Sequence, residues 1–332
     1  MKVTVAATLL ILTLSLPVLA KDMPAGQAAP PDITVLSTMV ASFLGEGEWG
    51  FAALLEFEDE VMLFDTGFKA DTVKRNAELM QKNLSDVETV VLSHFHSDHT
   101  GGLLSLRRAF MAQNSRAFSR VYVAEGFFRQ RYREDGAAVY SLSNPGFTES
   151  FDSPEAFREA AQSLGISFLE IDEPTEIRPG VVLTGPIPRV HDERNVSPGF
   201  FLKGSDGRLT RDTVPESQVM GINTEQGWTL LSGCGHAGIV NAGEYLRSMR
   251  KQPVHLAVGG FHLFRASDDV VQWTGRALQR FGVEQFVGAH CTGAHATRVL
   301  ANQLQLPRSA VSIGAIGTRI DRSGEILPSS IE

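Results

Sequence analysis

The chain has 332 residues, of which 43% are hydrophobic and 20% are charged, and its formal net charge is −8 at pH 7. This composition is that of an ordinary globular protein. The sequence has no run of basic residues and no basic segment interleaved with aromatic residues, which argues against a nucleic acid as ligand.

The first residues predict export. Residues 1–20 read "MKVTVAATLLILTLSLPVLA", with one charge at Lys2, an apolar run and small residues before a cleavage point after Ala20. This is the pattern of a secretory signal peptide. The apolar run is shorter than the about 20 residues that a membrane-spanning helix needs. An uncleaved N-terminal anchor is the alternative.

The residues after the signal peptide predict a soluble mature protein. Residues 21–31 are rich in Pro, Ala and Gly, which indicates a disordered leader. No later apolar run is long enough to cross a bilayer, so we expect a periplasmic or secreted protein without membrane attachment after cleavage. Loss of Lys2 with the signal peptide moves the net charge from −8 to −9.

The first half of the chain predicts strands that pair as hairpins. Short apolar runs bounded by charges indicate two strands within 50–67, and a Val-rich buried strand follows at 87–93. We expect a further strand at 120–125. The predicted helices of this half lie at 71–83, 102–112 and 154–165. The turn-rich, partly aromatic region 128–160 is interpreted as an insertion that covers a face.

In the second half, strands alternate with helices. We expect strands near 167–171, 180–184, 217–222, 227–232, 254–259, 284–288 and 311–321, and helices near 242–251, 267–282 and 293–304. The polar stretch 189–217 is predicted to be a long loop, which is either a functional lid or plain surface. Two mixed sheets with helices outside both fit this order, in a single domain over 32–332 with insertions near 128–160 and 189–217.

One stretch concentrates the histidines of the chain. "VVLSHFHSDHTGGL" (90–103) contains His94, His96, Asp98 and His99, although the chain has only nine histidines. At the end of a strand, alternate side chains point the same way, so His94 and His96 are expected to face one spot, with Asp98 and His99 beside it. Imidazole and carboxylate groups are ligands for zinc, manganese or iron. A solvated polar loop is the alternative, and we favour a metal site.

Two later histidines are candidates to complete that site. His236 in "LLSGCGHAG" and His290 in "FVGAHCTGAHA" each follow a short apolar strand and have glycines nearby, which let the backbone approach closely. His262 in "VGGFHLF" lies at another strand end, and we interpret it as a group beside the ligands or facing substrate, with direct ligation as the alternative. His255 lies inside a predicted strand and is expected to pack there.

The two cysteines, Cys234 and Cys291, each lie beside one of these histidines. In an oxidising compartment a pair of cysteines can form a structural disulfide, which stays an alternative here.

These motifs resemble the metallo-β-lactamase fold superfamily. "HFHSDH" (94–99) is similar to its His-x-His-x-Asp-His signature, and "LFDTG" (63–67) to an earlier strand whose aspartate, here Asp65, braces the metal loop. The order of "DTG", "LSHFHSDHTGG", "GCGHAG", "GGFHL" and "HCTG" resembles the branch described as dihydropterin synthase-like, over nearly the whole mature chain.

The resemblance implies a four-layer αββα sandwich of class α/β, with one or two divalent metals at one edge between the sheets. It implies that His94, His96 and His236 hold the first ion, and that Asp98, His99 and His290 hold the second. Zinc is the expected metal, with manganese or iron as other choices. Asp98 is also a candidate catalytic residue, as the general base that accepts a proton from water.

Two positions depart from the family pattern. Cys234 stands where many members have a bridging aspartate, which implies a bridge made by water alone, weaker occupancy of the second site, or a cysteine ligand. A small buried filler is the plainer interpretation of Cys234. Trp49 stands where many members of the branch have histidine, which implies a different substrate mouth.

The predicted function is an exported metal-dependent hydrolase of a small molecule, in which a metal-activated hydroxide attacks an ester, a phosphoester, or a cyclic ester or amide. A group transferase of the dihydropterin branch or an iron-dependent redox enzyme is the alternative, and a non-catalytic metal-binding protein is the second. The sequence does not indicate the oligomeric state.

Overall fold

The computed structural model describes residues 26–330, apart from residues 44, 140–149, 194 and 197. The predicted signal peptide (1–20) and the first part of the predicted leader therefore lie outside the described residues. The last part of that leader, 26–31, was predicted to be disordered, but in the structure it packs against the rest of the chain. The Ala28 N–H donates a hydrogen bond to the Asn223 carbonyl over 2.8 Å, and Ala28 is buried, so this segment packs onto the edge of a sheet.

The first sheet has eight strands in the order β19-β18-β1-β2-β3-β4-β5-β8. The strands are β1 (Asp32–Ser37), β2 (Ala52–Glu56), β3 (Val61–Phe64), β4 (Val87–Val91), β5 (Arg120–Ala124), β8 (Ser167–Ile171), β18 (Arg319–Ile320) and β19 (Ile326–Leu327). Strands β3, β4, β5 and β8 run parallel, whereas β1, β2 and β3 pair antiparallel, so the sheet is mixed.

The second sheet has seven strands in the order β17-β16-β15-β14-β13-β10-β9. The strands are β9 (Thr175–Arg178), β10 (Val181–Leu183), β13 (Val219–Thr224), β14 (Gly227–Ser232), β15 (Val254–Gly259), β16 (Gln285–Gly288) and β17 (Val311–Ser312). Strands β14 to β17 run parallel, and β9, β10, β13 and β14 pair antiparallel. Both predicted sheets are therefore present and both are mixed.

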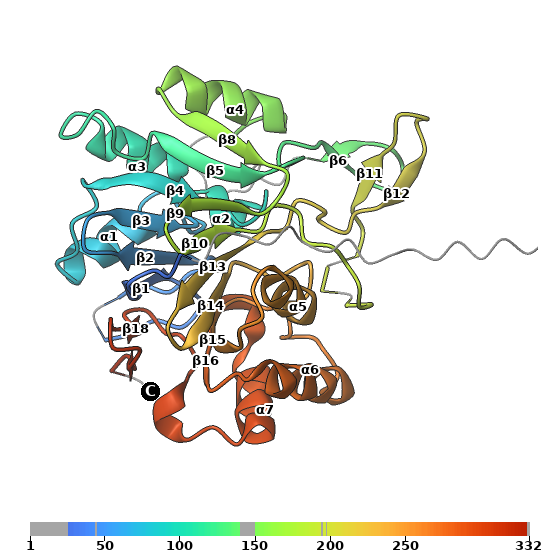
Figure 1. The fold of residues 1–332 in the computed structure, drawn as a ribbon. Coiled ribbons are helices and arrows are strands. Elements are labelled where there is room, and N and C mark those ends of the chain that lie inside the picture. The colour runs from blue at the N-terminus through green and yellow to red at the C-terminus, as the bar shows by residue number, and fades with distance from the viewer. Residues whose placement is uncertain (1–25, 44, 140–149, 194, 197, 331–332) are drawn as a thin grey trace, which may run out of the picture.

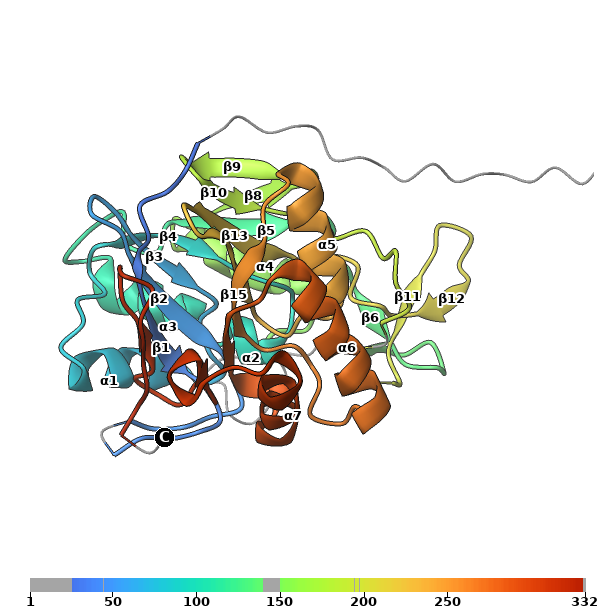
Figure 2. The ribbon, with the colours of Figure 1, turned by 60° about the horizontal axis from the view of Figure 1, so that its bottom comes forward.

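Helices cover the outer face of each sheet (Figures 1 and 2). The first sheet carries α1 (Thr72–Leu79), α3 (Leu103–Phe110) and α4 (Pro154–Ser163). The second carries α5 (Ile239–Met249), α6 (Asp268–Phe281) and α7 (Ala294–Leu304). The short helices are α2 (Ser97–Thr100), η1 (His290–Thr292) and η2 (Arg308–Ala310). This is the predicted four-layer αββα sandwich.

The residues of strand β2 are almost all apolar because both faces of the strand are buried. Leu54 packs into the core beneath helices α1, α3 and α4, whereas Ala53 and Leu55 face the core between the two sheets. Successive side chains of a strand point to opposite faces, so a strand buried on both faces needs apolar residues at every position. An unalternating apolar strand is the sequence pattern of a central layer in this sandwich.

The two predicted insertions meet in a third, small sheet. Its order is β12-β11-β6-β7, and its strands are β6 (Arg131–Tyr132), β7 (Ala138–Val139), β11 (Phe201–Lys203) and β12 (Leu209–Arg211). Figure 1 shows β6, β11 and β12 projecting from one end of the sandwich. The stretch 189–217 is therefore not only loop, since it contributes a hairpin that pairs with the first insertion. Part of that insertion, 140–149, lies outside the described residues.

The predicted strand 311–321 is two strands in different sheets. Strand β17 pairs with β16, and β18 pairs with β1, so the chain crosses from the second sheet to the first between them. Gly314 and Gly317 have positive φ angles in this crossing, a conformation that glycine adopts without the steric cost of a side chain. Strands β1 and β9 are present although the sequence analysis did not predict them.

Within the described part of the chain, no helix combines the length and the apolar character that a bilayer crossing requires.

Candidate metal centre

The histidine cluster lies where several strands end at one edge of the sandwich. Strands β3 and β4 run parallel, so their carboxyl ends bring Asp65 and the loop 92–96 together. Strands β14, β15 and β16 are also parallel, and the residues after them include Cys234, His262 and His290. Parallel strands thus collect residues that are more than 200 positions apart in the sequence, such as Asp65 and His290.

The first donor set contains His94, His96 and His236. The His94 Nε2 and His96 Nδ1 atoms are 3.0 Å apart, and the ring centroids of His94 and His236 are 4.6 Å apart. The donor atoms of His94, His236 and Cys234 all lie within 4.8 Å of one another. When two nitrogens bind the same zinc ion at about 2.0–2.1 Å, the distance between them is of the same order as the one between His94 Nε2 and His96 Nδ1.

The second donor set contains Asp98, His99 and His290, again with Cys234. The Asp98 Oδ2 atom is 3.6 Å from His99 Nε2 and 3.3 Å from His290 Nε2. The Cys234 sulfur is 3.2 Å from His99 Nε2 and 3.3 Å from His290 Nε2. Cys234 belongs to both sets, so it lies where the resemblance places a bridging residue.

Hydrogen bonds outside the two sets orient the ligand rings. The Asp65 carboxylate accepts hydrogen bonds from His99 Nδ1 over 2.6 Å and from the Ser93 hydroxyl over 2.8 Å. The Ser93 oxygen in turn lies 2.9 Å from His94 Nδ1. These contacts place a proton on each of the two Nδ1 atoms, so that each Nε2 atom faces a donor set and is the atom available to a metal. Asp65 thus contacts both the His99 ring and the residue that precedes His94.

His236 provides a test of whether the site fits a metal. Its Nδ1 atom donates to the Asn195 carbonyl over 2.6 Å, so its Nε2 atom carries the lone pair. That Nε2 atom is buried and has no hydrogen-bond partner among the described residues. A buried nitrogen without a partner is costly, and a metal ion in the His94–His96–His236 set would satisfy it. The residues present fit a metal ion.

Burial keeps the first set neutral. It lowers the pKa of His94 and of His236 well below the ordinary value, and it lowers the pKa of His96 to about 4. A neutral imidazole is the form that binds a metal.

The second set attracts positive charge. Burial opposes protonation of His99, but the Asp98 and Asp65 carboxylates raise the pKa of His99 to about 10. Burial likewise opposes protonation of His290, and the Cys291 sulfur and Asp98 together raise the pKa of His290 to about 9. Without a metal these two rings carry protons beside the Asp98 carboxylate. A divalent cation would replace those protons.

Three site residues have unusual backbone angles. Asp65, His262 and His290 have φ values of +57°, +48° and +47°, in a region that residues with a side chain seldom adopt. Such conformations cost roughly 1–3 kcal/mol each and concentrate at functional sites. The fold holds these side chains at the metal edge against their local backbone preference.

Gly233 makes room for the bracing contacts. A Cβ atom at this position would collide with the Ser93 hydroxyl and with the Asp65 carboxylate. Any side chain at 233 would therefore separate the strand that carries Cys234 from the loop that carries His94.

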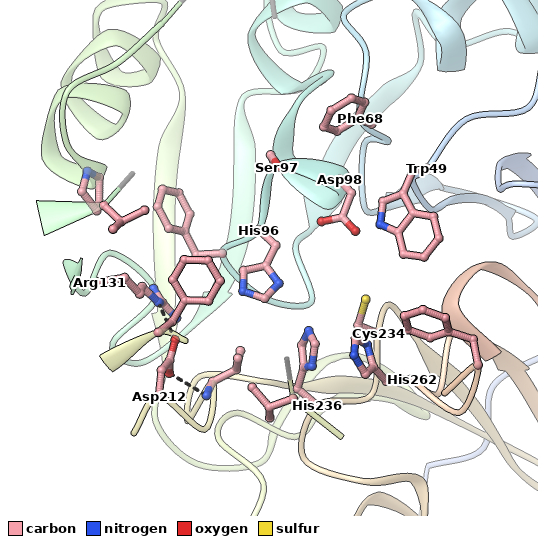
Figure 3. Close-up of a pocket in the computed structure, with 17 residues that line it drawn as sticks. Trp49, Phe68, His96, Ser97, Asp98, Arg131, Asp212, Cys234, His236 and His262 are labelled. Atoms are coloured by element: carbon pink, nitrogen blue, oxygen red, sulfur yellow. Dashed lines mark hydrogen bonds and ion pairs between the residues drawn. The ribbon is translucent and has the colours of Figure 1, made fainter. Parts of the chain in front are cut away.

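The donor sets open into a cavity of about 410 Å³ (Figure 3). His96, Asp98, Cys234, His236 and His262 point into one space in this view. The walls are largely aromatic and aliphatic, and they are formed by Trp49, Phe68, Phe95, Val139, Pro154, Val196, Phe200, Val214 and Phe264. Trp49 also contacts His290 edge to face, with ring centroids 5.4 Å apart. Trp49 therefore forms part of the mouth of the site.

The cavity contains one Lys or Arg side chain among the described residues, Arg131, and it is fully paired. Its Nε atom contacts the Asp212 carboxylate over 3.1 Å, and a terminal nitrogen contacts Glu216. The other terminal nitrogen donates to the Arg129 carbonyl over 2.9 Å. One arginine between two carboxylates leaves no free positive charge on this wall.

The structure also locates residues that the sequence analysis missed. Arg131, Asp212, Ser93 and Asn195 all support or line the site, and each lies in a loop or short strand without a recognisable motif. Ser93 alone carried a signal, because it directly precedes His94. His255 lies in β15 beside Thr229 and belongs to none of the donor sets among the described residues. Cys234 and Cys291 are free thiols in the structure, so the structural disulfide is not formed.

Residues 50–199 match the family model of the metallo-beta-lactamase superfamily. These residues belong to the metallo-β-lactamase superfamily. The match includes Asp65 and the His94–His99 loop, whereas His236 and His290 lie beyond it. In the structure, the His236 ring contacts the His94 ring and the His290 ring contacts the His99 ring. Both histidines therefore lie against the matched His94–His99 loop.

Three known proteins are similar to this chain over most of its length. The chain is 26% identical over 264 residues to a 7,8-dihydropterin-6-methyl-4-(beta-D-ribofuranosyl)-aminobenzene-5'-phosphate synthase of Methanocaldococcus jannaschii, over 77% of this chain and 85% of that protein. A solved metal-dependent hydrolase of the beta-lactamase superfamily is 26% identical, with a TM-score of 0.68 over 88% of this chain and 98% of that chain. The metallo-beta-lactamase fold protein YhfI of Bacillus subtilis is 13% identical, with a TM-score of 0.52 over 87% and 98% of the two chains. The last likeness concerns the fold alone.

Proposed function

We propose that this protein is an exported metal-dependent hydrolase of a small molecule. The observation that carries the proposal is the meeting of two donor sets at Cys234, at the base of a largely apolar cavity. The metallo-β-lactamase fold and the similar metal-dependent hydrolase support it. A site that only stored metal would need no substrate-sized cavity beside the ligands.

His94, His96 and His236 would hold one ion, and Asp98, His99 and His290 a second. When bound, divalent ions such as zinc, or manganese or iron, supply Lewis-acid charge and lower the pKa of a water molecule. The chain contributes the Asp98 carboxylate, which faces the cavity and can accept a proton. Asp65 keeps His99 oriented, and the aromatic walls exclude bulk water from the reacting groups.

The cavity favours an uncharged ester, lactone or amide over a phosphoester. A phosphoester is anionic and is usually held by free arginine or lysine side chains. Arg131 is already paired with Asp212 and Glu216, and the described lining of the cavity includes no other arginine or lysine. A substrate with an apolar or aromatic group would instead gain from contact with Trp49 and Phe264.

A panel of chromogenic substrates tests this proposal. Zinc-, manganese- and iron-loaded protein is assayed with a carboxylic ester, a lactone and a phosphodiester, and we expect the ester or lactone to be turned over faster than the phosphodiester. Replacement of Asp98 by Asn should abolish turnover, while the matched exposed variant Asp86→Asn should retain it. Metal-loaded protein that cleaves none of the three substrates would contradict the proposal.

Group transfer is a second candidate because the curated relative at 26% identity is a synthase. A transferase would show little turnover with water alone and would become active when an acceptor nucleophile is added. An optical spectrum of anaerobically purified protein separates both candidates from an iron-dependent redox enzyme, which should show iron absorption that changes on oxidation.

Export is tested independently of catalysis. We propose cleavage after Ala20, so N-terminal sequencing of protein from fractionated cells should find Lys21 as the first residue in the exported pool. Protein that keeps Met1 and remains in the cytosol would show that residues 1–20 are not a cleaved signal.

A further inference from the structure

A third group of metal-binding atoms lies beside the two donor sets. The sulfur atoms of Cys234 and Cys291 and a ring nitrogen of His262 all lie within 4.8 Å of one another. Both cysteines are buried. Cys291 takes no part in the two sets already described, and the proposed hydrolytic function does not require it.

The fold brings the two sulfur atoms together across a strand. Cys234 follows β14 and Cys291 lies in η1 after β16, so the end of β15 separates them. That end carries Gly260, where a Cβ atom would approach the Cys291 sulfur to 2.9 Å and collide with the Gly233 carbonyl. The missing side chain lets the Cys291 thiol reach the Cys234 carbonyl, 3.7 Å away.

The surroundings of Cys291 suit a sulfur that carries negative charge. The backbone N–H of His262 donates to the Cys291 sulfur over 3.3 Å. A hydrogen bond from a backbone N–H stabilises a thiolate, and such contacts are typical around cysteine ligands of metals. A buried cysteine that only filled space would not require a donor directed at its sulfur.

His262 supplies an imidazole with one nitrogen that lacks a hydrogen-bond partner. Its Nδ1 atom is buried without a hydrogen-bond partner among the described residues, and its φ of +48° is strained for a residue with a side chain. His262 lines the cavity above the donor sets and also a neighbouring cavity of about 640 Å³, so an ion can reach it from solvent.

We propose that Cys234, Cys291 and His262 form a binding site for a soft, thiophilic metal ion. Two thiolates and one imidazole select soft ions, whereas the neighbouring sets of imidazole and carboxylate suit harder dications. Binding of a divalent ion replaces the two thiol protons, which are released to solvent, and involves no change of oxidation state.

The sulfur site and the hydrolytic centre share Cys234. The Cys234 sulfur lies 3.2 Å from His99 Nε2 and 3.3 Å from His290 Nε2, and it cannot serve both sites fully. A soft ion held by Cys291 and His262 therefore draws Cys234 away from the second donor set. The ion weakens zinc binding at Asp98, His99 and His290 without touching their side chains.

Cadmium is the probe that tests this site. Metal-free, reduced full-length protein is titrated anaerobically with Cd²⁺, and absorption from thiolate-to-cadmium charge transfer is recorded. We expect Cys291→Ser to lower the absorption per bound ion to about half, because one of two thiolates is lost, and to weaken binding by about tenfold or more. His262→Ala should weaken binding similarly but keep the absorption. His295→Ala, a change at an exposed histidine paired with Asp268, is the matched control and should alter neither.

Three outcomes would overturn the proposal. Equal absorption and affinity in wild type and Cys291→Ser would show that cadmium uses Cys234 alone. A lack of free thiols in protein purified without reductant would show a disulfide instead of a metal site. If Cys291→Ser does not fold, unchanged cadmium affinity in His262→Ala is decisive against the site. The hydrolysis panel is scored on protein loaded with zinc, manganese or iron and without cadmium, so failure of either proposal leaves the other distinguishable.

Discussion

At the scale of single residues, three of the candidate ligands depend on a neighbour that orients the ring. His99 is oriented by Asp65, His236 by the Asn195 carbonyl, and His94 through Ser93. The ligand types and their spacing were predictable from "HFHSDH", because few other functions require imidazoles so close together. The bracing groups were less predictable, since serine, asparagine and a backbone carbonyl are common in any loop.

The His96→Ala variant tests the first donor set. His96 Nδ1 lies 3.0 Å from His94 Nε2, so its loss leaves that set without one of its three imidazoles. We expect metal content to fall by about one ion per chain and hydrolysis to fall by at least about tenfold, because loss of a ligand costs more than loss of a supporting contact. Metal analysis and turnover are measured together. Full metal content in His96→Ala would mean that the site is assigned wrongly, and His295→Ala controls for loss of any histidine.

Cys234 is tested by two substitutions with opposite expectations. Cys234→Ser retains the size but binds metal weakly, and should weaken the second ion more than the first. Cys234→Asp provides a carboxylate between the sets, and should be tolerated and tighten binding of the second zinc ion. Stepwise zinc titration of wild type and both variants measures the two affinities. Unchanged affinities at both sites in all three proteins would leave Cys234, which is 2% exposed, as a packing residue.

At the scale of elements, the sequence predicts those that are long and buried on defined faces. Helix α6 and strands β14 and β15 occur near their predicted positions because their apolar patterns extend over several residues. Strands β11 and β12 were missed, since each has three residues in a polar stretch and is defined by its partner rather than by its own composition. Pairing between distant insertions leaves no local pattern.

The small third sheet depends on a buried ion group. Arg131 in β6 contacts Asp212 and Glu216, which follow β12, and all three side chains are nearly inaccessible. The Glu216 carboxylate also accepts the Phe95 N–H over 3.4 Å, so the group connects the insertions to the metal loop. The insertions are thereby coupled to the position of His94 and His96.

Arg131→Ala should therefore destabilise more than one element. Removing the arginine leaves two buried carboxylates unpaired, and breaking a buried pair in this way costs about 3–5 kcal/mol. Urea unfolding measures the loss of free energy of unfolding, and zinc titration should show weaker binding by the first donor set. Arg133→Ala removes an exposed arginine of the same hairpin and should leave both quantities nearly unchanged. Equal stability of the two variants would show that the ion group does not hold the insertions.

At the scale of the whole molecule, the candidate metal centre is assembled from strand ends of both sheets. The four-layer arrangement was predictable from the order of strands and helices, and from the resemblance of five motifs in one order. The crossing at 311–321 was not predictable, because the sequence of this stretch does not reveal which sheet each half joins. The shape of the cavity also depends on insertions whose pairing is tertiary.

The stability of the metal-free protein should pass through a maximum near neutral pH. His99 and His290 have pKa values raised to about 10 and about 9. Their protonation stabilises the folded state fully below the ordinary histidine pKa near 6.5, and this contribution is lost as the pH rises through 9 and 10. The pKa of His96 is lowered to about 4, so the unfolded chain binds a proton more readily and stability also falls between pH 6.5 and 4.

Zinc should remove the alkaline side of this profile, because the ion replaces the protons on His99 and His290. Urea unfolding of metal-free and zinc-loaded protein between pH 4 and pH 10 measures both profiles, and each proton difference contributes a slope of about 1.4 kcal/mol per pH unit. We expect the two forms to diverge above pH 7, with the metal-free form losing stability. If metal-free protein became more stable from pH 7 to pH 10, the carboxylates would not be holding protons on these rings, and the second donor set would lack the charge balance that makes it a cation site.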